Sequence, residues 1–183
     1  QAGQPGYEYR ETLSSLALAA QAGGYTALAP FPRTNPPIQS GVEIKYLKEF
    51  NKHLPAILYP IGAVSQDLGN KDLTEMIDMI HSGAVAFSDG RKYPLEQGLL
   101  TRALEYVIPF NSLIIDFPLD RSLTTEGQMH EGKVSTSLGL TGIPSVGEEI
   151  TIHRDLQLAA YTKSRLHFHA ISAAGSVALI QKA

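Results

Sequence analysis

Apolar and polar residues follow a repeating order along this chain: a stretch with helical spacing, a Gly or Pro break, then a short apolar run. The stretch "LTEMIDMIHSG" places apolar residues at i, i+3, i+4 and i+7 and ends at Gly83. The short runs that follow the breaks are rich in strand formers and apolar on both faces, as in buried parallel strands. The pattern therefore predicts an α/β protein whose parallel strands are joined by helical crossovers.

The boundaries of the predicted elements come from caps and breaks. Ser40 is an N-cap candidate, and Gly23 and Gly24 are expected to supply a left-handed cap after the first helix. Helices are predicted from about Glu8 to Gln21, after Ser40, over 73–83, over 94–110, over 144–162 and over 172–183. Strands are predicted over 25–31, 56–64, 84–90, 112–118 and 165–172.

Five such units fit either an open doubly wound sheet or part of a (β/α)8 barrel. Length alone favours the open sheet, because a complete barrel needs about 250 residues. The unusual polar residues favour the barrel, since they gather where strands run into loops, the functional face of that fold. We therefore predict that residues 1–183 form a single (β/α) barrel-type domain, incomplete at both ends. Uncovered sheet edges would favour self-association.

Composition excludes several classes of protein. The chain has 183 residues, 43% of them hydrophobic, and a net charge of −3. Its 15 basic residues are spread along the chain beside 18 acidic ones, so we expect no nucleic-acid partner. The apolar runs are too short for a membrane span, and the absence of Cys is typical of a cytoplasmic protein without disulfides.

The strand "RLHFHAIS" raises the question of a metal site. Alternation along a strand sends His167 and His169 to the same face, where two imidazoles could share an ion. A zinc site needs three or four ligands, and without Cys the others would be His, Asp or Glu. The alternative is a pair of histidines whose ring nitrogens are hydrogen-bonded within the protein.

Three segments occur in a specific combination: "QPGYEYRET" with "AAQAGGYTALAPFPRTNPP", then "AFSDG", then "GQMHEGKVSTSLGLTGIPSVGEEITIHRDLQLAAYT". In this combination the chain resembles the dihydroorotases of pyrimidine synthesis, which are metal-dependent cyclic-amide hydrolases built on a (β/α)8 barrel. The resemblance covers nearly the whole chain. It implies zinc as cofactor and a cyclic amide as substrate.

The functional positions that the resemblance carries over are only partly kept. Gln1 falls on the second histidine of the family's opening metal motif, and Gly3 on its carboxylate-binding arginine. Arg33 falls on the substrate-binding asparagine, with Asn35 close by, so both are substrate-binding candidates. Asp89 in "AFSDG" corresponds to the bridging aspartate and is the candidate catalytic and metal-binding carboxylate.

Two further metal positions are replaced. Phe117 stands where the family has a histidine after the fourth predicted strand. Aligning Ser172 with the family's serine puts Ala170 at the last metal histidine, with His169 one residue off and facing the other way. Rearranged ligands would have to come from residues such as His167, His169, His130 or Asp116.

Two hypotheses follow from the resemblance. In the first, the chain is a non-catalytic dihydroorotase homologue that has lost the binuclear metal site and serves as an assembly partner of aspartate carbamoyltransferase. In the second, it is an active metal-dependent dihydroorotase in which Asp89, His167 and His169 hold the metal. The number of surviving ligands favours the first hypothesis.

Overall fold

Short parallel strands and longer helices alternate along the chain in the computed structural model, which describes residues 2–91, 94–124 and 127–183. The α-helices are α1 (Leu13–Ala22), α2 (Gly41–Phe50), α3 (Met76–Ser82), α4 (Gln97–Val107), α5 (Lys133–Leu138), α6 (Val146–Thr162) and α7 (Ala174–Gln181). The strands are β1 (Ala27–Leu28), β2 (Ile57–Leu58), β3 (Ile61–Gly62), β4 (Ala86–Phe87), β5 (Leu113–Asp116), β6 (Met129–His130), β7 (Gly142–Ile143) and β8 (Arg165–Phe168). Single 3-10 turns lie at η1 (Asn51–His53), η2 (Gln66–Leu68) and η3 (Ile108–Phe110).

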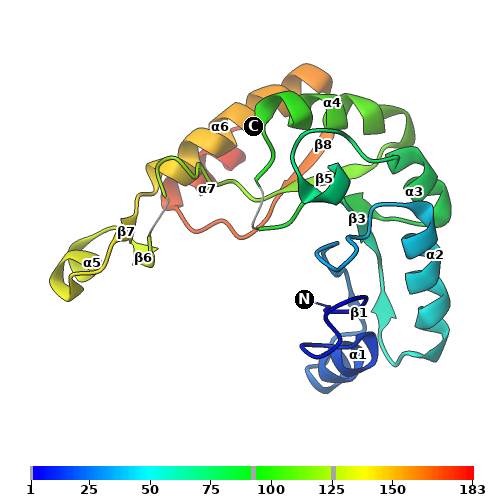
Figure 1. Ribbon diagram of the computed structural model, residues 1–183. Coiled ribbons are helices and arrows are strands. Elements are labelled where there is room, and N and C mark those ends of the chain that lie inside the picture. Colours follow the sequence, from blue (N-terminus) through cyan, green and yellow to red (C-terminus); the bar gives the residue numbers. More distant parts are fainter. Residues whose placement is uncertain (1, 92–93, 125–126) are drawn as a thin grey trace.

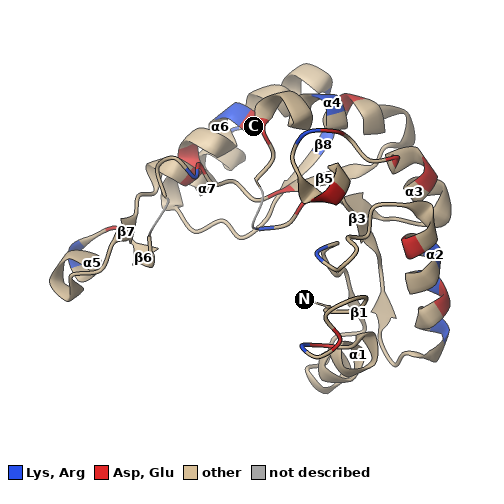
Figure 2. Cartoon of the chain, viewed as in Figure 1, with Lys and Arg blue, Asp and Glu red and all other residues tan. Residues whose placement is uncertain are grey.

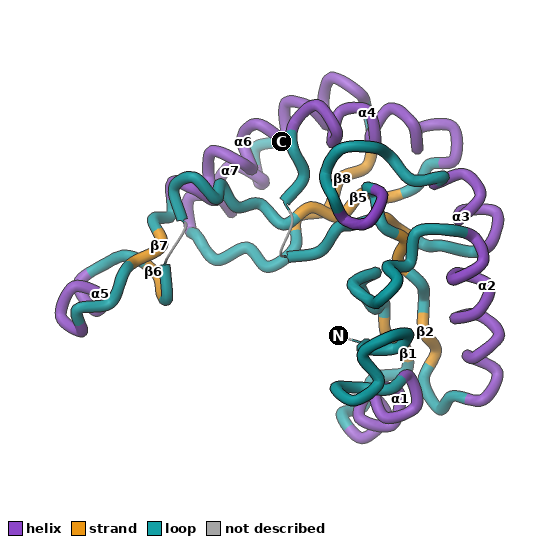
Figure 3. The backbone as a smooth tube through the Cα atoms, viewed as in Figure 1, coloured by secondary structure: helices purple, strands orange, loops and turns teal. Residues whose placement is uncertain are grey.

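The strands pair in parallel around an arc. A four-stranded sheet has the order β3-β4-β5-β8, while β1 pairs with β2 and β6 with β7. Helices α2, α3, α4 and α6 follow the outer side of the arc (Figure 1), and loops that leave the strands lie on its inner side (Figure 3). This arrangement confirms the predicted parallel (β/α) units, curved as in part of a TIM-type barrel.

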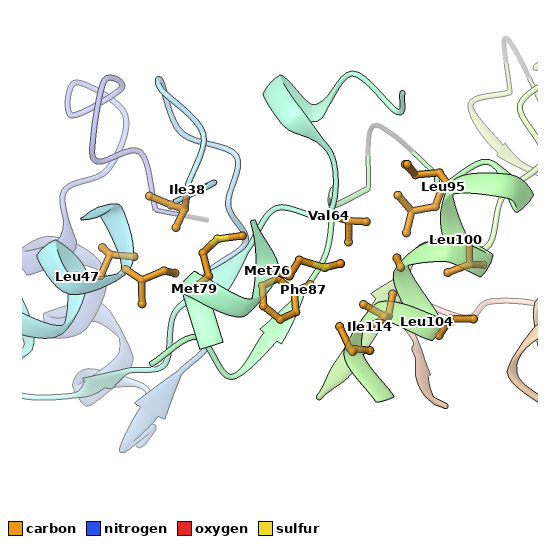
Figure 4. Close-up of a cluster of buried hydrophobic side chains, with 14 of the residues drawn as sticks. Ile38, Leu47, Val64, Met76, Met79, Phe87, Leu95, Leu100, Leu104 and Ile114 are labelled. Atoms are coloured by element: carbon orange, nitrogen blue, oxygen red, sulfur yellow. The ribbon is translucent and has the colours of Figure 1, made fainter. Parts of the chain in front are cut away.

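A continuous apolar core lies between the strands and the outer helices (Figure 4). Phe87 of β4 is fully buried and lies close to Gly62 of β3. A Cβ added at Gly62 would lie 2.8 Å from the Met79 sulfur and 2.9 Å from the Phe87 ring. Leu104 of α4 is also fully buried in this core. The backbone of β3 therefore packs against side chains at a distance that leaves no room for another methyl group.

Local signals set several element ends as expected. The Ser40 hydroxyl accepts a hydrogen bond from Val42 N at 3.3 Å, so the predicted N-cap of α2 is confirmed. Gly83 ends α3 with a φ of +108°, a conformation that glycine adopts without strain. After α1 only Gly24 is left-handed, with a φ of +80°, whereas Gly23 has a φ of −82°.

The predicted start of the first helix is wrong. We expected it near Glu8, but residues 4–6 and 8–10 form turns and α1 begins at Leu13. The turn at Gly6 has a φ of +89°, and the Thr12 hydroxyl accepts a hydrogen bond from Ser15 N at 3.1 Å. The side-chain cap at Thr12 thus fixes the helix start, because it satisfies an amide that the helix itself leaves unpaired.

The run "AILYPIGAV" does not form one strand. It forms β2 and β3 on either side of Pro60, which has no N–H to donate to a neighbouring strand. Between the predicted strand over 112–118 and the predicted helix over 144–162, the structure contains three further elements, β6, α5 and β7. Figure 1 shows these three elements as an arm that projects away from the arc.

Charged residues of both signs are interspersed over the outer helices (Figure 2). In the part of the chain that the structure describes, no helix has the length and apolar character that crossing a membrane requires.

Candidate functional site

Three loops that follow β1, β4 and β8 meet around a cavity of about 300 Å³ at the carboxyl ends of the strands. They contribute Arg33, Arg91 and His169, respectively. The remaining wall is apolar and consists of Ala2, Leu16, Leu28, Ala29, Pro30 and Phe31. Because the carboxyl ends of parallel strands form one edge, residues far apart in sequence converge there.

Aromatic rings contact two of the three basic side chains. The Arg91 guanidinium carbon lies 5.2 Å from the centre of the Phe117 ring, a cation–π distance. The Phe31 and His169 rings meet edge to face with their centres 4.9 Å apart. Phe117, which was expected at the position of a histidine ligand, therefore contacts an arginine.

Asp89 is buried and directed toward the chain that follows β3. Its Oδ1 accepts hydrogen bonds from Val64 N at 2.8 Å and Ser65 N at 3.0 Å, and its Oδ2 accepts one from the Ser65 hydroxyl. Burial raises the pKa of Asp89, while the hydrogen bonds from Ser65 and Val64 oppose that rise. Both oxygens thus have protein donors, which suits a residue that holds a loop.

The two histidines of the "RLHFHAIS" segment lie in different settings. His167 is exposed on β8, paired with Ile115, whereas His169 follows the strand and lines the cavity. The predicted alternation does not extend to His169, because β8 ends at Phe168 and Ala170 has a φ of +61°. Burial, then Arg91, then His167 lower the pKa of His169, so a neutral ring is favoured.

Among the other residues singled out from the sequence, Arg33 lines this cavity and Asn35 and Gly3 do not. Arg33 lines it, and the aliphatic part of its side chain lies against Gly90. Asn35 is exposed and borders a neighbouring cavity, which Arg33 also lines. Gly3 lacks space for a side chain, since an added Cβ would lie 2.3 Å from the Tyr7 carbonyl oxygen. Gln1 lies outside the described residues.

Comparison with known proteins assigns the family. A family model described as dihydro-orotase-like matches residues 2–176. The chain is 42% identical over 180 residues to a dihydroorotase of Pelotomaculum thermopropionicum and 40% identical over 181 residues to one of Syntrophus aciditrophicus. Each match covers 98% of this chain.

The chain belongs to the dihydroorotase-like family. It spans 42% of the length of these two curated relatives. Among solved structures, L-hydantoinase from Arthrobacter aurescens matches 91% of this chain and 38% of its own, with a TM-score of 0.72 and 21% identity. A D-hydantoinase structure matches with a TM-score of 0.65 and 16% identity. These structural matches support the barrel-type α/β fold.

Membership of the dihydroorotase-like family implies a metal-dependent ancestor, but the residues present do not fit a metal centre. Within residues 2–91, 94–124 and 127–183, no group of three or more His, Asp or Glu side chains is placed to hold an ion. Two arginines, Arg33 and Arg91, line the cavity, and the carboxylate of Asp89 is bound to Ser65 and Val64. Arginine is always charged and repels a cation, so this lining disfavours zinc.

Two of the alternative metal ligands, His130 and Asp116, do not line the cavity. His130 is exposed on the arm in β6. Asp116 is buried at the end of β5, where its Oδ1 accepts a hydrogen bond from Leu95 N at 3.2 Å. Its carboxyl group also contacts that of Asp155 on α6. Asp116 therefore belongs to the contact between β5 and the helix layer.

Two acidic residues of α6 make buried contacts within the protein. Glu148 is buried and accepts hydrogen bonds from Ser172 N at 2.9 Å and Ala173 N at 2.9 Å, at the start of α7. Burial opposes its charge, but these bonds and the one from the Ser172 hydroxyl hold the pKa of Glu148 below its usual value. Asp155 is fully buried beside Arg154.

Sequence reasoning missed Arg91, although it follows the quoted "AFSDG" directly. Its position immediately after the β4 loop was the available signal, because residues there face the functional edge of a barrel. Its contact with Phe117 joins two loops that are separated by 26 positions, and only the fold reveals it.

Proposed function

We propose that this protein is a non-catalytic dihydroorotase-like homologue that acts in cytoplasmic pyrimidine biosynthesis as an assembly partner of aspartate carbamoyltransferase. The observation that carries the proposal is the cavity at the strand ends, which is lined by Arg33, Arg91, His169 and apolar side chains. Hydrolysis of a cyclic amide by this family depends on a metal that polarises the carbonyl and supplies hydroxide. A cavity without a ligand set for that metal lacks both functions.

The projecting arm supports the assembly part of the proposal. Val134 is 59% exposed, Leu138 is 62% exposed, and Leu140 also lies at the surface. At the base of the arm, Val146 and Ile150 of α6 are exposed as well. Several exposed apolar side chains on one projecting element are typical of a protein interface. The same surface would serve self-association if the partner were a second copy.

A second candidate function is an active dihydroorotase with rearranged zinc ligands. It is favoured by His167 and His169, which lie close enough for one to lower the pKa of the other, and by relatives named dihydroorotase. Asp89 would have to give up its bonds to Val64 and Ser65 to join them.

Elemental analysis and an activity assay separate the two candidates. If the protein is the non-catalytic homologue, purification with zinc should leave much less than one zinc ion per chain. Dihydroorotate hydrolysis should then not exceed the rate without enzyme. An active relative, such as the Pelotomaculum thermopropionicum dihydroorotase, serves as the positive control. Stoichiometric zinc with turnover would refute the non-catalytic proposal and favour the second candidate.

Sedimentation velocity tests the partner. The protein should form a defined complex with the catalytic chain of aspartate carbamoyltransferase, and Leu138→Asp should weaken that complex. Val42→Asp is the matched control, because Val42 is a similarly exposed apolar residue on α2, away from the arm. If both variants behave like the unmodified protein, the arm is not the interface; if the unmodified protein forms no complex, the proposed partner is wrong.

A further inference from the structure

We infer that two copies of this chain pair through the helices at the two ends of the arc, with α1 of each copy against α7 of the other. The two contacts are related by one two-fold axis, so the assembly closes as a dimer. This inference goes beyond the proposed function, because it concerns neither the cavity at the strand ends nor the projecting arm.

The composition of α1 and α7 is the first reason. Neither helix contains Asp, Glu, Lys or Arg: α1 has the sequence LSSLALAAQA and α7 has AGSVALIQ. Every other α-helix that the structure describes contains at least one of these residues. A helix at the surface normally has a charged face opposite its apolar face, whereas a helix that is apolar on all sides is covered by other protein. The sequences of α1 and α7 are thus typical of helices with a further partner.

Each of the two helices is buried on one face and exposed on the other within a single chain. On α1, Ala17 is fully buried, whereas Leu18 beside it is 58% exposed. On α7, Ser176 is fully buried, whereas Val177 beside it is 47% exposed. Each exposed face therefore presents an apolar side chain without a charged residue of the same helix around it. Such faces are suited to pack against each other.

The arrangement of the strands leads to the same two ends. Among the described strands of the arc, β1 and β8 are the outermost, and each pairs with one neighbour only, β2 and β5, respectively. In Figure 1, α1 lies at one end of the arc and α7, beside α6, at the other. A strand edge without a partner favours association unless another element covers it. A helix pair at each end would cover both edges.

The exposed area of the chain is sufficient for this contact. A folded monomer of 19.8 kDa exposes about 8,600 Å² on average. This chain exposes 10042 Å², an excess of about 1,400 Å² over that average. An interface of standard size buries about 800 Å² of each partner. Each copy can therefore bury a stable interface and still expose as much surface as an ordinary monomer.

A second copy fits both ends of the arc at once. The rotation that brings α1 of one copy against α7 of the other also brings α7 of the first against α1 of the second. A partner with another sequence would need two separate apolar surfaces with the same spacing as the ends of the arc. Because neither helix is charged, the contact does not depend on ion pairs and should persist at high salt.

Sedimentation equilibrium of the 183-residue protein tests the inference. The unmodified protein should have twice the mass of one chain at low and at high salt. Leu18→Glu and Val177→Glu should each raise the dissociation constant of the dimer by about tenfold or more, because each places a carboxylate without a partner in both contacts. Circular dichroism checks that the variants are folded, as expected for substitutions at exposed positions.

Leu138→Glu and Val42→Glu are the matched controls. Leu138 lies on the arm and Val42 on α2, and both are exposed apolar residues outside the proposed contacts. Both variants should remain dimers. Dissociation by Leu138→Glu without an effect of Leu18→Glu would place the contact between copies in the arm and overturn the inference.

The two test variants also separate the proposed pairing from other pairings. Weakening by both supports contact of α1 with α7. Weakening by one alone would indicate a contact of α1 with α1 or of α7 with α7, and weakening by neither would exclude both helices; each result overturns the inference. An unmodified protein that stays monomeric at high concentration would overturn it as well, because something other than a second copy would then cover these helices. Zinc content and hydrolysis are unaffected by these outcomes, so failure here leaves the proposed function standing.

Discussion

Replacement of Asp155 by Asn should change how the stability of this protein depends on pH. Asp155 on α6 and Asp116 at the end of β5 are 0% and 2% exposed, and their carboxyl groups contact each other. No N–H or O–H of the described residues reaches the Oδ2 atom of either side chain. Burial and then the charge of Asp116 raise the pKa of Asp155 to about 8, although Arg154 opposes the rise. The pair therefore shares one proton at neutral pH.

The size of the effect follows from proton linkage. An unperturbed Asp titrates at 3.8, so between about pH 4 and pH 8 the folded protein binds roughly one proton more than the unfolded chain does. Because the folded pKa is the higher one, the free energy of unfolding falls as pH rises through this window. The slope for one proton is about 1.4 kcal/mol per pH unit, or about 3 kcal/mol between pH 5 and pH 7.

Urea denaturation followed by far-UV circular dichroism, at half-unit steps from pH 5 to pH 8, measures that slope. In Asp155→Asn the side-chain amide donates to Asp116 without titrating, so the variant should lose most of the slope and exceed the unmodified protein in stability at pH 8. Glu105→Gln, which removes an exposed carboxyl group from α4, should leave the slope unchanged. An Asp155→Asn profile as steep as that of the unmodified protein would refute the shared proton.

Three further substitutions test the packing around the site. Glu148→Ala removes the acceptor for three donors of Ser172 and Ala173, so urea titration should show a loss of about 1–3 kcal/mol and hydrogen exchange should show faster opening of α7. Gly62→Val places carbon atoms against Met79 and should cost about 1–3 kcal/mol by the same measurement; no change would mean that β3 shifts freely. Leu104→Ala should cost about 2–5 kcal/mol because it leaves a cavity in the core, and a smaller loss would show that α4 closes over it.

The order of helices and strands was predictable from the sequence because it rests on local signals. Ser40 and Gly83 mark element ends by capping chemistry that involves only a few neighbouring residues. Both residues of β3 and both residues of β4 are buried, as expected for strands beneath a helix layer. Where the prediction failed, a competing local feature decided the outcome: the Thr12 cap displaced the start of α1, and Pro60 interrupted the strand.

The site was less predictable because its geometry depends on contacts between distant loops. Asp89 was chosen as a metal-binding carboxylate from its motif, but its oxygens bind Ser65 and Val64, 24 and 25 positions earlier in the chain. Glu148 and Asp155 are buried, although charged residues on a helix usually lie at the surface. Their burial follows from the packing of α6 against α7 and β5, which periodicity within α6 does not reveal.

The surroundings of Phe117 and Gly3, two positions at which the resemblance implies other residues, bear on what a metal centre would require here. Phe117, where the resemblance implies a histidine, contacts the guanidinium of Arg91, and Arg91 lines the cavity. At Gly3, where the resemblance implies a carboxylate-binding arginine, an added Cβ would collide with the Tyr7 carbonyl oxygen. Restoring one histidine at Ala170 would leave the arginines, the engaged Asp89 and the closed turn at Gly3 unchanged. A metal centre would need several of these changes to be reversed together, because each ion requires three or four ligands that converge on one point.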